Sequence, residues 1–402
     1  INGEYSKSAI APFTPNFFRL PGYTFWLTFI FLIFKSFIPA VFLGIAIFAL
    51  SAPSVYLITR EVFSEKLALW SGIIFALEPR MAFSAPFLLS EQIFLPLFLL
   101  AIFFVVKFIN YPEQKKIVLL SAAMFGLLAL FKAIVLYLWP FTAVLFYFSF
   151  RKKFSSKQIA KTLALSTLVV IIFIMPWILR NKLVLNTWQL SSTGGLVIYW
   201  GHLEILERYL GTPSDLAYQK LIDKSNRLVG PDRETVEATK ILSREATTEI
   251  KNNLPLYLKI YFLNLPLFFI TDGYKGILSY VSSINQYYVI FIDLLLRLKF
   301  REFFEELKSL SLFNIILPIV GRSIWLGLNI LSFLGIYLSI KNMAEKRSII
   351  ILFAFLILYF ATLTGPIGFD PRYRMPVNGF LIAFATVSVF HFFNLNFKHE
   401  KS

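Results

Sequence analysis

Residues 76–94 read ALEPRMAFSAPFLLSEQIF and join two long apolar runs. Three ionisable residues, Glu78, Arg80 and Glu91, stand in this stretch among side chains that suit a lipid environment. A charged side chain costs about 2.5–3.5 kcal/mol at the centre of a membrane helix on insertion scales, so such residues usually face a cavity or a partner. Glu91 is therefore the first candidate functional residue, and an ion pair between Glu91 and Arg80 is the structural alternative.

The composition indicates an all-α polytopic membrane protein. The 402 residues are 57% hydrophobic and 18% aromatic, whereas a soluble domain has about 45–50% apolar residues. The net charge of +16 comes from short basic clusters between apolar runs, which is the pattern of cytoplasmic loops, so we expect no nucleic-acid partner. The absence of cysteine excludes disulfides and thiolate metal sites.

The apolar runs predict a multi-helix transmembrane bundle. Residues 22–34 are aromatic-rich but shorter than the roughly 20 residues that a span needs, so we expect an interfacial helix there. Eleven spans are predicted, at residues 38–58, 67–85, 91–108, 117–132, 134–150, 161–179, 256–271, 305–320, 323–341, 348–364 and 377–394. The sequence leaves the path of residues 272–310 open.

The charge pattern orients these spans. If residues 1–35 lie outside, most short-loop Lys and Arg collect on one side, which is then the cytoplasmic side. Glu91, Lys132 and the 365–376 loop then share the extracytoplasmic face. The chain divides into an outer loop with the interfacial helix (1–35), N-terminal membrane helices (36–179), an extracytoplasmic loop domain (180–254) and C-terminal membrane helices (255–402).

The outer loop before the last span carries two arginines, against the positive-inside trend. Arg372 and Arg374 flank Tyr373, and guanidinium groups bind phosphate through several directed hydrogen bonds. We therefore predict an anion site. The alternatives are anchoring to lipid headgroups and a salt bridge to Asp370.

Three further outer cations have less distinctive surroundings. Arg19 precedes the interfacial helix and could be an ordinary interface anchor, and a lysine at a span end such as Lys132 usually reaches toward the headgroups. Arg180 ends the span at 161–179 and could mark the interface. Residues 192–195 (STGG) could cradle a phosphate through backbone N–H groups, but they lack the lysine of a nucleotide loop, which favours a plain turn.

The order of these motifs resembles the protein O-mannosyltransferase and aminoarabinose transferase group of membrane glycosyltransferases, which have the GT-C superfold. The resemblance covers almost the whole chain. Its motifs are Arg19-Leu-Pro-Gly-Tyr, Ser84-Ala-Pro-Phe-Leu-Leu-Ser-Glu91, Gly126-Leu-Leu-Ala-Leu-Phe-Lys132, Pro176-Trp-Ile-Leu-Arg-Asn181, Ser192-Thr-Gly-Gly195, Tyr199-Trp-Gly201 and Pro371-Arg-Tyr-Arg-Met-Pro376.

The resemblance implies an inverting transfer of one sugar from a polyprenyl-phosphate donor to a lipid, glycan or protein acceptor on the outer face of the plasma membrane. It implies that Arg19 contacts the donor phosphate, with Arg372 and Arg374 as further contacts, and that Glu91 is the second acidic position. Supporting contacts are expected from Tyr373, Lys132 and Arg180. No cofactor or metal site is predicted, and a divalent metal is left open.

The resemblance also implies a principal catalytic carboxylate upstream of the Arg19 turn. The chain begins with Ile1, and Glu4 is its only acid before Arg19, nearer the turn than the resemblance suggests. We therefore expect this base upstream of the given residues, with Glu4 as a weaker candidate. Two other functions remain open at this stage: a lipid-linked oligosaccharide flippase or transporter, and an oligosaccharide polymerase or ligase that uses a lipid-diphosphate donor.

Overall fold

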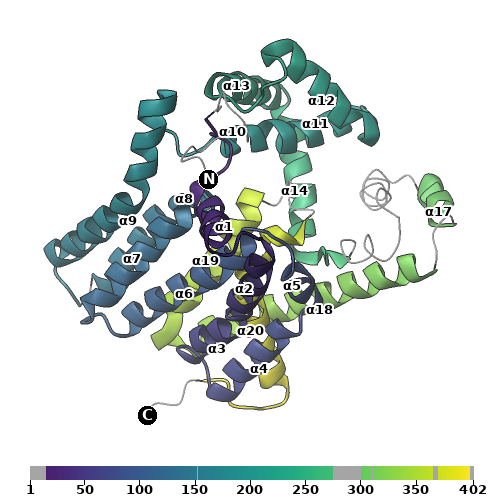
Figure 1. Ribbon diagram of the computed structural model, residues 1–402. Helices are drawn as coiled ribbons and strands as arrows, with labels where there is room; N and C mark the ends of the chain where they lie inside the picture. The colour runs from purple at the N-terminus through teal and green to yellow at the C-terminus, as the bar shows by residue number, and fades with distance from the viewer. Residues whose placement is uncertain (1–14, 152, 275–299, 309–311, 365–369, 399–402) are drawn as a thin grey trace.

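The structure, a computed structural model, describes residues 15–151, 153–274, 300–308, 312–364 and 370–398. Within these ranges the regular elements are all helices, and Phe63 and Lys398 form an isolated bridge (Figure 1). This confirms the all-α fold. Glu4 lies outside the described residues, as do residues 275–299 of the segment whose path the sequence left open.

The N-terminal half forms nine helices whose ends follow local sequence signals. Pro21 and Pro79 each stand at the first position of a helix, where the missing N–H costs nothing, and Ser155 and Gln158 form a capping box. The helices are α1 (Pro21–Phe34), α2 (Ile38–Ala49), α3 (Ser51–Arg60), α4 (Glu65–Ala76), α5 (Pro79–Ser84), α6 (Glu91–Asn110), α7 (Lys115–Ala129), α8 (Ile134–Phe150) and α9 (Ser156–Leu185).

A polar helical cluster, residues 193–252, follows α9 and lies at the top of Figure 1. It has its own apolar core, which includes Tyr199, Leu206 and Leu242. It consists of α10 (Thr193–Val197), the π-helix η1 (Ile198–Leu203), α11 (Glu204–Tyr209), α12 (Ser214–Val229) and α13 (Val236–Asn252). The chain then bends by 95° into α14 (Leu254–Ile270), which returns to the bundle.

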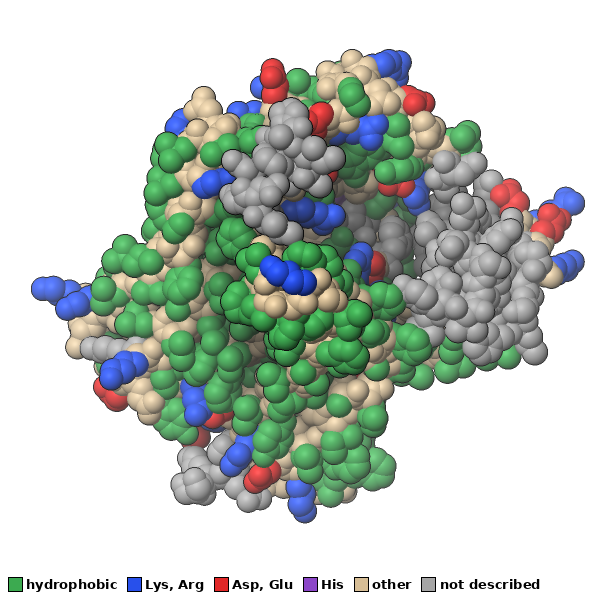
Figure 2. All heavy atoms as spheres, viewed as in Figure 1, with side chains coloured by type: hydrophobic (Ala, Val, Ile, Leu, Met, Phe, Trp, Pro, Cys, Tyr) green, Lys and Arg blue, Asp and Glu red, His purple; other side chains and the backbone are tan. Residues whose placement is uncertain are grey.

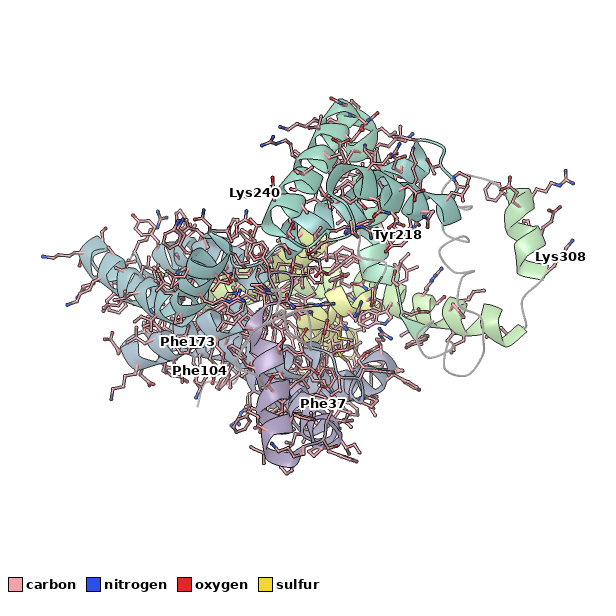
Figure 3. All side chains as sticks on the ribbon, turned by 45° about the horizontal axis from the view of Figure 1, so that its top comes forward. Phe37, Phe104, Phe173, Tyr218, Lys240 and Lys308 are labelled. Carbon is pink, nitrogen blue, oxygen red and sulfur yellow. The ribbon has the colours of Figure 1, made fainter. Side chains whose placement is uncertain are left out.

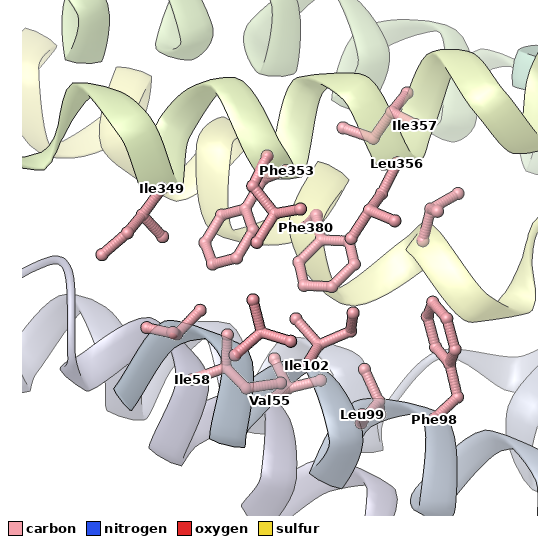
Figure 4. Close-up of a cluster of buried hydrophobic side chains, with 14 of the residues drawn as sticks. Val55, Ile58, Phe98, Leu99, Ile102, Ile349, Phe353, Leu356, Ile357 and Phe380 are labelled. Atoms are coloured by element: carbon pink, nitrogen blue, oxygen red, sulfur yellow. The ribbon is translucent and has the colours of Figure 1, made fainter. Parts of the chain in front are cut away.

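The C-terminal helices complete the bundle core. They are α17 (Phe300–Lys308), α18 (Leu312–Asn342), η2 (Ala344–Lys346), α19 (Arg347–Thr364), η3 (Pro371–Tyr373) and α20 (Met375–Phe392). Almost every residue of α20 is buried, because α18, α19 and α4 pack around it. Figure 4 shows Phe380 of α20 beside Phe353 of α19, above Val55 of α3 and Ile102 of α6.

Six helices in the described part of the chain are long and apolar enough to cross a membrane, or seven if the bent pair α13–α14 counts as one span. The prediction of eleven spans is therefore not met there. The runs at 117–132 and 134–150 form the shorter apolar helices α7 and α8, and residues 22–34 coincide with the 14-residue α1. The six spans lie at Ile38–Arg60, Glu91–Asn110, Ser156–Leu185, Ile316–Asn342, Ala344–Thr364 and Met375–Phe392.

Three of the predicted spans are wrong in detail. The run at 67–85 breaks at Glu78 into α4 and the six-residue α5, because Pro79 starts a new helix there. The predicted break between the spans at 305–320 and 323–341 is absent, because residues 312–342 form one continuous helix, α18, through Gly321, while residues 305–308 belong to α17. A Cβ on Gly321 would lie 2.5 Å from Oδ2 of Asp272, so this glycine serves close packing rather than a helix break.

The outer surface of the bundle suits lipid. Figure 2 shows hydrophobic side chains over much of the visible face, with the charged side chains mainly toward its edges. In Figure 3, Phe37 and Phe173 project from the bundle, and Tyr218 and Lys240 lie on the polar helical cluster. Only 17% of the apolar window of α9 is buried, so most of that helix faces outward.

Candidate active site

Glu91 and Lys132 form an ion pair at one end of the bundle, which we call the Glu91 end. Glu91 is the first residue of α6, where a carboxylate also interacts favourably with the helix dipole. Lys132 lies in the turn between α7 and α8, and its Nζ donates to Oε1 of Glu91 at 2.7 Å. Nζ also lies 5.1 Å from the ring centroid of Phe94. The Lys132 side chain is 24% exposed and the Glu91 side chain is 11% exposed, so the pair is only partly screened by solvent.

The Pro21-Gly22-Tyr23 turn that begins α1 packs against the sequence neighbours of both partners of this ion pair. The N–H of Gly22 donates to the carbonyl of Leu130 at 2.9 Å, two residues before Lys132. A Cβ on Gly22 would lie 2.7 Å from the Phe131 ring, so only glycine allows this approach. The Tyr23 hydroxyl donates to Oε1 of Gln92, the residue after Glu91, at 3.2 Å. Three motifs that are distant in sequence therefore meet at the Glu91 end.

Arg372 adds a second cation to this end. Its Nε donates to Oδ2 of Asp370 at 2.5 Å, and Arg80 approaches the other carboxylate oxygen at 3.5 Å. Burial lowers the pKa of Arg372, but the carboxylates of Asp370 and then Glu91 outweigh burial and raise the pKa above its ordinary value. The salt bridge to Asp370, which the sequence left as an alternative, is therefore present. The Arg372 side chain is still 35% exposed.

Arg80 does not pair with Glu91, which corrects the structural alternative considered for Glu91. Its Nη2 lies 3.5 Å from Asp370, and its Nη1 donates to the carbonyl of Gly273 at 3.5 Å. Lys132 takes the place beside Glu91 instead. Arg80 therefore joins α5 to the segment that follows α14 and to Asp370, which directly precedes η3.

Arg374 is buried beneath this surface, with an exposed fraction of 1%. Its Nε donates to Oδ1 of Asn378 at 3.0 Å, and its two terminal nitrogens donate to the carbonyls of Phe268, Phe269 and Thr271. The guanidinium also lies 3.6 Å from the ring centroid of Trp325. These contacts engage all three guanidinium nitrogens, so Arg374 joins α14, α18 and α20.

Two buried carboxylates near Arg374 were not among the predicted site residues. Oε2 of Glu78 accepts from the N–H of Met81 at 2.8 Å, while Oε1 has no hydrogen-bond partner among the residues that the structure describes. Oδ1 of Asp272 accepts from the N–H of Tyr274 at 3.1 Å, while Oδ2 has no partner in the described part of the chain. Burial raises the pKa of both carboxyls. The sequence signal for Glu78 was its place in the same polar stretch as Glu91, and Asp272 had no comparable signal.

Arg19 and Arg180 lie where the N-terminal segment meets the start of the polar helical cluster. Arg19 is exposed, and its guanidinium lies 4.6 Å from the ring centroid of Phe18. Arg180 donates to the carbonyl of Asn16 at 3.2 Å and lies 4.9 Å from the Trp177 ring centroid. Arg180 therefore helps to hold the segment that carries Arg19.

The predicted turn at residues 192–195 is instead the beginning of helix α10. The N–H of Ser192 donates to the carbonyl of Phe17, and the hydroxyl of Thr193 donates to that of Phe18 at 2.8 Å. Gly195 packs against α13, because a Cβ there would lie 2.9 Å from Thr239. The motif therefore binds the chain's own N-terminal segment.

These helices and contacts agree with a comparison against known protein families. Residues 18–179 match the family of dolichyl-phosphate-mannose-protein mannosyltransferases. The match includes Arg19, Glu91 and Lys132 and ends before Arg180, so the 370–374 loop lies beyond it. It confirms the resemblance drawn from the motifs, and it indicates a membrane glycosyltransferase of the mannosyltransferase type. Neither the curated proteins nor the solved structures contain a match to the chain.

Proposed function

We propose that the chain transfers a sugar, with inversion, from a polyprenyl-phosphate donor to an acceptor on the extracytoplasmic face of the cytoplasmic membrane. The observation that carries the proposal is the meeting of Glu91, Lys132 and the Pro21–Tyr23 turn at one end of the bundle. All of these residues lie within the stretch that matches the mannosyltransferase family.

In this proposal the cations at the Glu91 end stabilise the leaving phosphate. The bond from the anomeric carbon to the donor phosphate oxygen breaks, the acceptor oxygen bonds to that carbon from the opposite face, and the acceptor loses its proton to a base. Negative charge grows on the departing lipid phosphate, and preorganised cations in a partly dry site stabilise such charge strongly. Lys132 and Arg372 are the first two candidates, and Arg19 on the adjacent segment is the third.

Glu91 is assigned the positioning of Lys132 rather than proton abstraction. A carboxylate that already accepts a 2.7 Å hydrogen bond from an ammonium group is stabilised in its charged form and is a weaker base. A charged partner also fixes the direction of a lysine side chain, which otherwise samples many rotamers. We do not include Arg374 among the phosphate ligands, because its donors are already satisfied by four protein oxygens.

The donor's isoprenoid chain is expected to approach through the lipid beside α1. Phe25 and Phe29 of this short helix are 56% and 59% exposed, and they lie within two turns of the Pro21–Tyr23 turn. A prenyl chain packed there would place its phosphate near the Glu91 end. The acceptor would enter from the side of the polar helical cluster.

The test is donor consumption by the full chain in lipid nanodiscs. Radiolabelled polyprenyl-phosphate mannose is supplied first, followed by other hexose and pentose donors, and release of the polyprenyl phosphate is measured. We expect Lys132→Gln and Arg372→Gln each to lower donor kcat/KM by about tenfold or more, as for a lost electrostatic contact in a transition state. Lys182→Gln is the control, since the Lys182 ammonium group donates to Oδ1 of Asn186 at the end of α9 and is not among the candidate phosphate contacts.

The same assay separates the alternatives. Consumption of diphosphate but not monophosphate donors would favour the polymerase or ligase, and movement of intact donor across the membrane without consumption would favour the flippase. Equal activity of the wild type, Lys132→Gln and Arg372→Gln would overturn the assigned site.

A further inference from the structure

An apolar cavity lies at the other end of α6 from Glu91. It is a partly open cavity between α6, α8 and the first turns of α9, and its lining includes Phe108, Phe146, Phe150 and Ile159. Phe108 is 17 positions after Glu91, which corresponds to about 25 Å along a helix. The cavity is therefore separate from the candidate active site.

The cavity wall is an aromatic cluster. Phe108 lies 5.4 Å from Phe146 and 5.2 Å from Phe150 between ring centroids, and Phe150 lies 6.0 Å from Phe154. Three of these rings are at least 95% buried, so they keep their positions without a ligand. Such a wall accepts a hydrocarbon chain and offers it no hydrogen bonds.

The rim of the cavity is polar and lies in the most basic part of the chain. Gln158 and Thr162 line the cavity, and each directly follows an exposed lysine, Lys157 and Lys161. Apart from Lys132, which lies at the Glu91 end, residues 107–161 contain eight Lys or Arg and one acidic residue, Glu113. The N-terminus of α9 also lies here, and its helix dipole attracts anions. These basic surroundings favour a ligand with a negative headgroup.

We propose that this cavity binds an anionic diacyl phospholipid. One acyl chain packs against Phe108 and Phe150, and the phosphate lies beside Lys157 and Lys161 at the start of α9. Charge complementarity selects this occupant, because basic pockets between membrane helices attract anionic headgroups and a zwitterionic headgroup gains much less. By the positive-inside pattern this end faces the cytoplasm, so the lipid would come from the cytoplasmic leaflet.

The test uses the full chain, released from vesicles of palmitoyl-oleoyl phosphatidylglycerol or phosphatidylcholine, with bound lipid counted by native mass spectrometry. We expect at least one phosphatidylglycerol to stay bound where phosphatidylcholine does not. The double variant K157Q/K161Q should lower its retention about tenfold, since each basic residue near an anionic lipid contributes to binding. The control K66Q/K341Q removes two exposed lysines of other loops and should retain the lipid.

A second pair of variants tests the acyl chain. Thr162→Trp should fill the cavity and lower phosphatidylglycerol retention, whereas Leu165→Trp, at a 45% exposed position on the same helix, should leave it unchanged. Melting temperatures identify any variant that fails to fold. Equal retention of the two lipids, or equal losses in K157Q/K161Q and K66Q/K341Q, would overturn the proposal, and so would full retention by a folded Thr162→Trp.

Discussion

The ammonium group of Lys132 lies 2.7 Å from Oε1 of Glu91, although 41 positions separate the two residues in sequence. The pair joins the start of α6 to the turn between α7 and α8, and the Gly22 N–H secures the same turn through Leu130. The ion pair to Glu91 and the fixed turn keep the Lys132 ammonium group in place. Lys132 is therefore a preorganised cation, which is what the proposed leaving phosphate requires.

Glu91→Gln should reduce transfer much more than it reduces folding. The amide still accepts a hydrogen bond from Lys132 but no longer attracts its charge, so we expect donor kcat/KM to fall about tenfold to a hundredfold. The unfolding free energy should fall by about 1–2 kcal/mol, as for one lost charged hydrogen bond. Donor kinetics and thermal unfolding in nanodiscs measure the two effects.

The double variant Glu91→Gln/Lys132→Gln gives the control for this prediction. If the two residues act through each other, the double variant should lose no more activity than Lys132→Gln alone. Fully additive losses in log kcat/KM would show that Glu91 acts independently of Lys132, and unchanged transfer by Glu91→Gln would remove its role altogether.

Arg374→Lys should destabilise the protein even though the charge is kept. A lysine cannot reproduce donation from Nε and both terminal nitrogens to four oxygens, so buried carbonyls of the α14 end would lose their partners. We expect the free energy of unfolding to fall by about 2–4 kcal/mol, measured by thermal unfolding. Arg372→Lys, at a 35% exposed site, should cost less than about 1 kcal/mol. Equal losses would contradict the structural role of Arg374.

Gly335→Ala should weaken the contact between α18 and α20. A Cβ at Gly335 would lie 1.9 Å from the carbonyl oxygen of Phe384, so the two helices would have to separate. We expect the free energy of unfolding to fall by about 1–3 kcal/mol from overpacking. Gly327→Ala on the same helix meets nothing within 4 Å and should be neutral or stabilising by up to about 1 kcal/mol. Thermal unfolding of both variants is the check, and similar melting temperatures would refute the close approach.

Stability of the polar helical cluster should fall when the pH falls below about 6.5, the ordinary value for histidine. Burial lowers the pKa of His202, whose Nδ1 lies 2.6 Å from the Tyr257 hydroxyl. Between the ordinary and the lowered pKa the unfolded chain binds more protons than the folded one, so stability rises with pH in this window. Hydrogen exchange of residues 193–252 at pH 5 and pH 7.5 measures the effect. His202→Gln should reduce the difference, and an unchanged difference would assign it to other groups.

The sequence alone was enough to predict the class of the protein and to name candidate site residues that the structure brings together. Long apolar runs without charge indicate membrane helices. In hydrocarbon the backbone N–H and C=O groups find no outside partners, and a helix pairs them within the same segment. Glu91 stood out because a carboxylate near membrane depth is costly, and Arg372 because it runs against the positive-inside trend, whereas Lys132 had only the weak signal of a lysine at a span end. The structure brings all three to one end of the bundle. The motif order around them also resembled the mannosyltransferase family, which residues 18–179 match.

The tertiary structure decided the partners and the helix boundaries. Nothing in the sequence could show that Glu91 pairs with Lys132 and Arg80 with Asp370, since each choice depends on how helices far apart in the chain pack together. The same holds for Arg374, which looked equivalent to Arg372 two positions away but points into the protein, where the carbonyl ends of α14 bind it. The sequence shows that a residue is charged, whereas the packing of the helices determines whether that charge faces a ligand or another part of the chain.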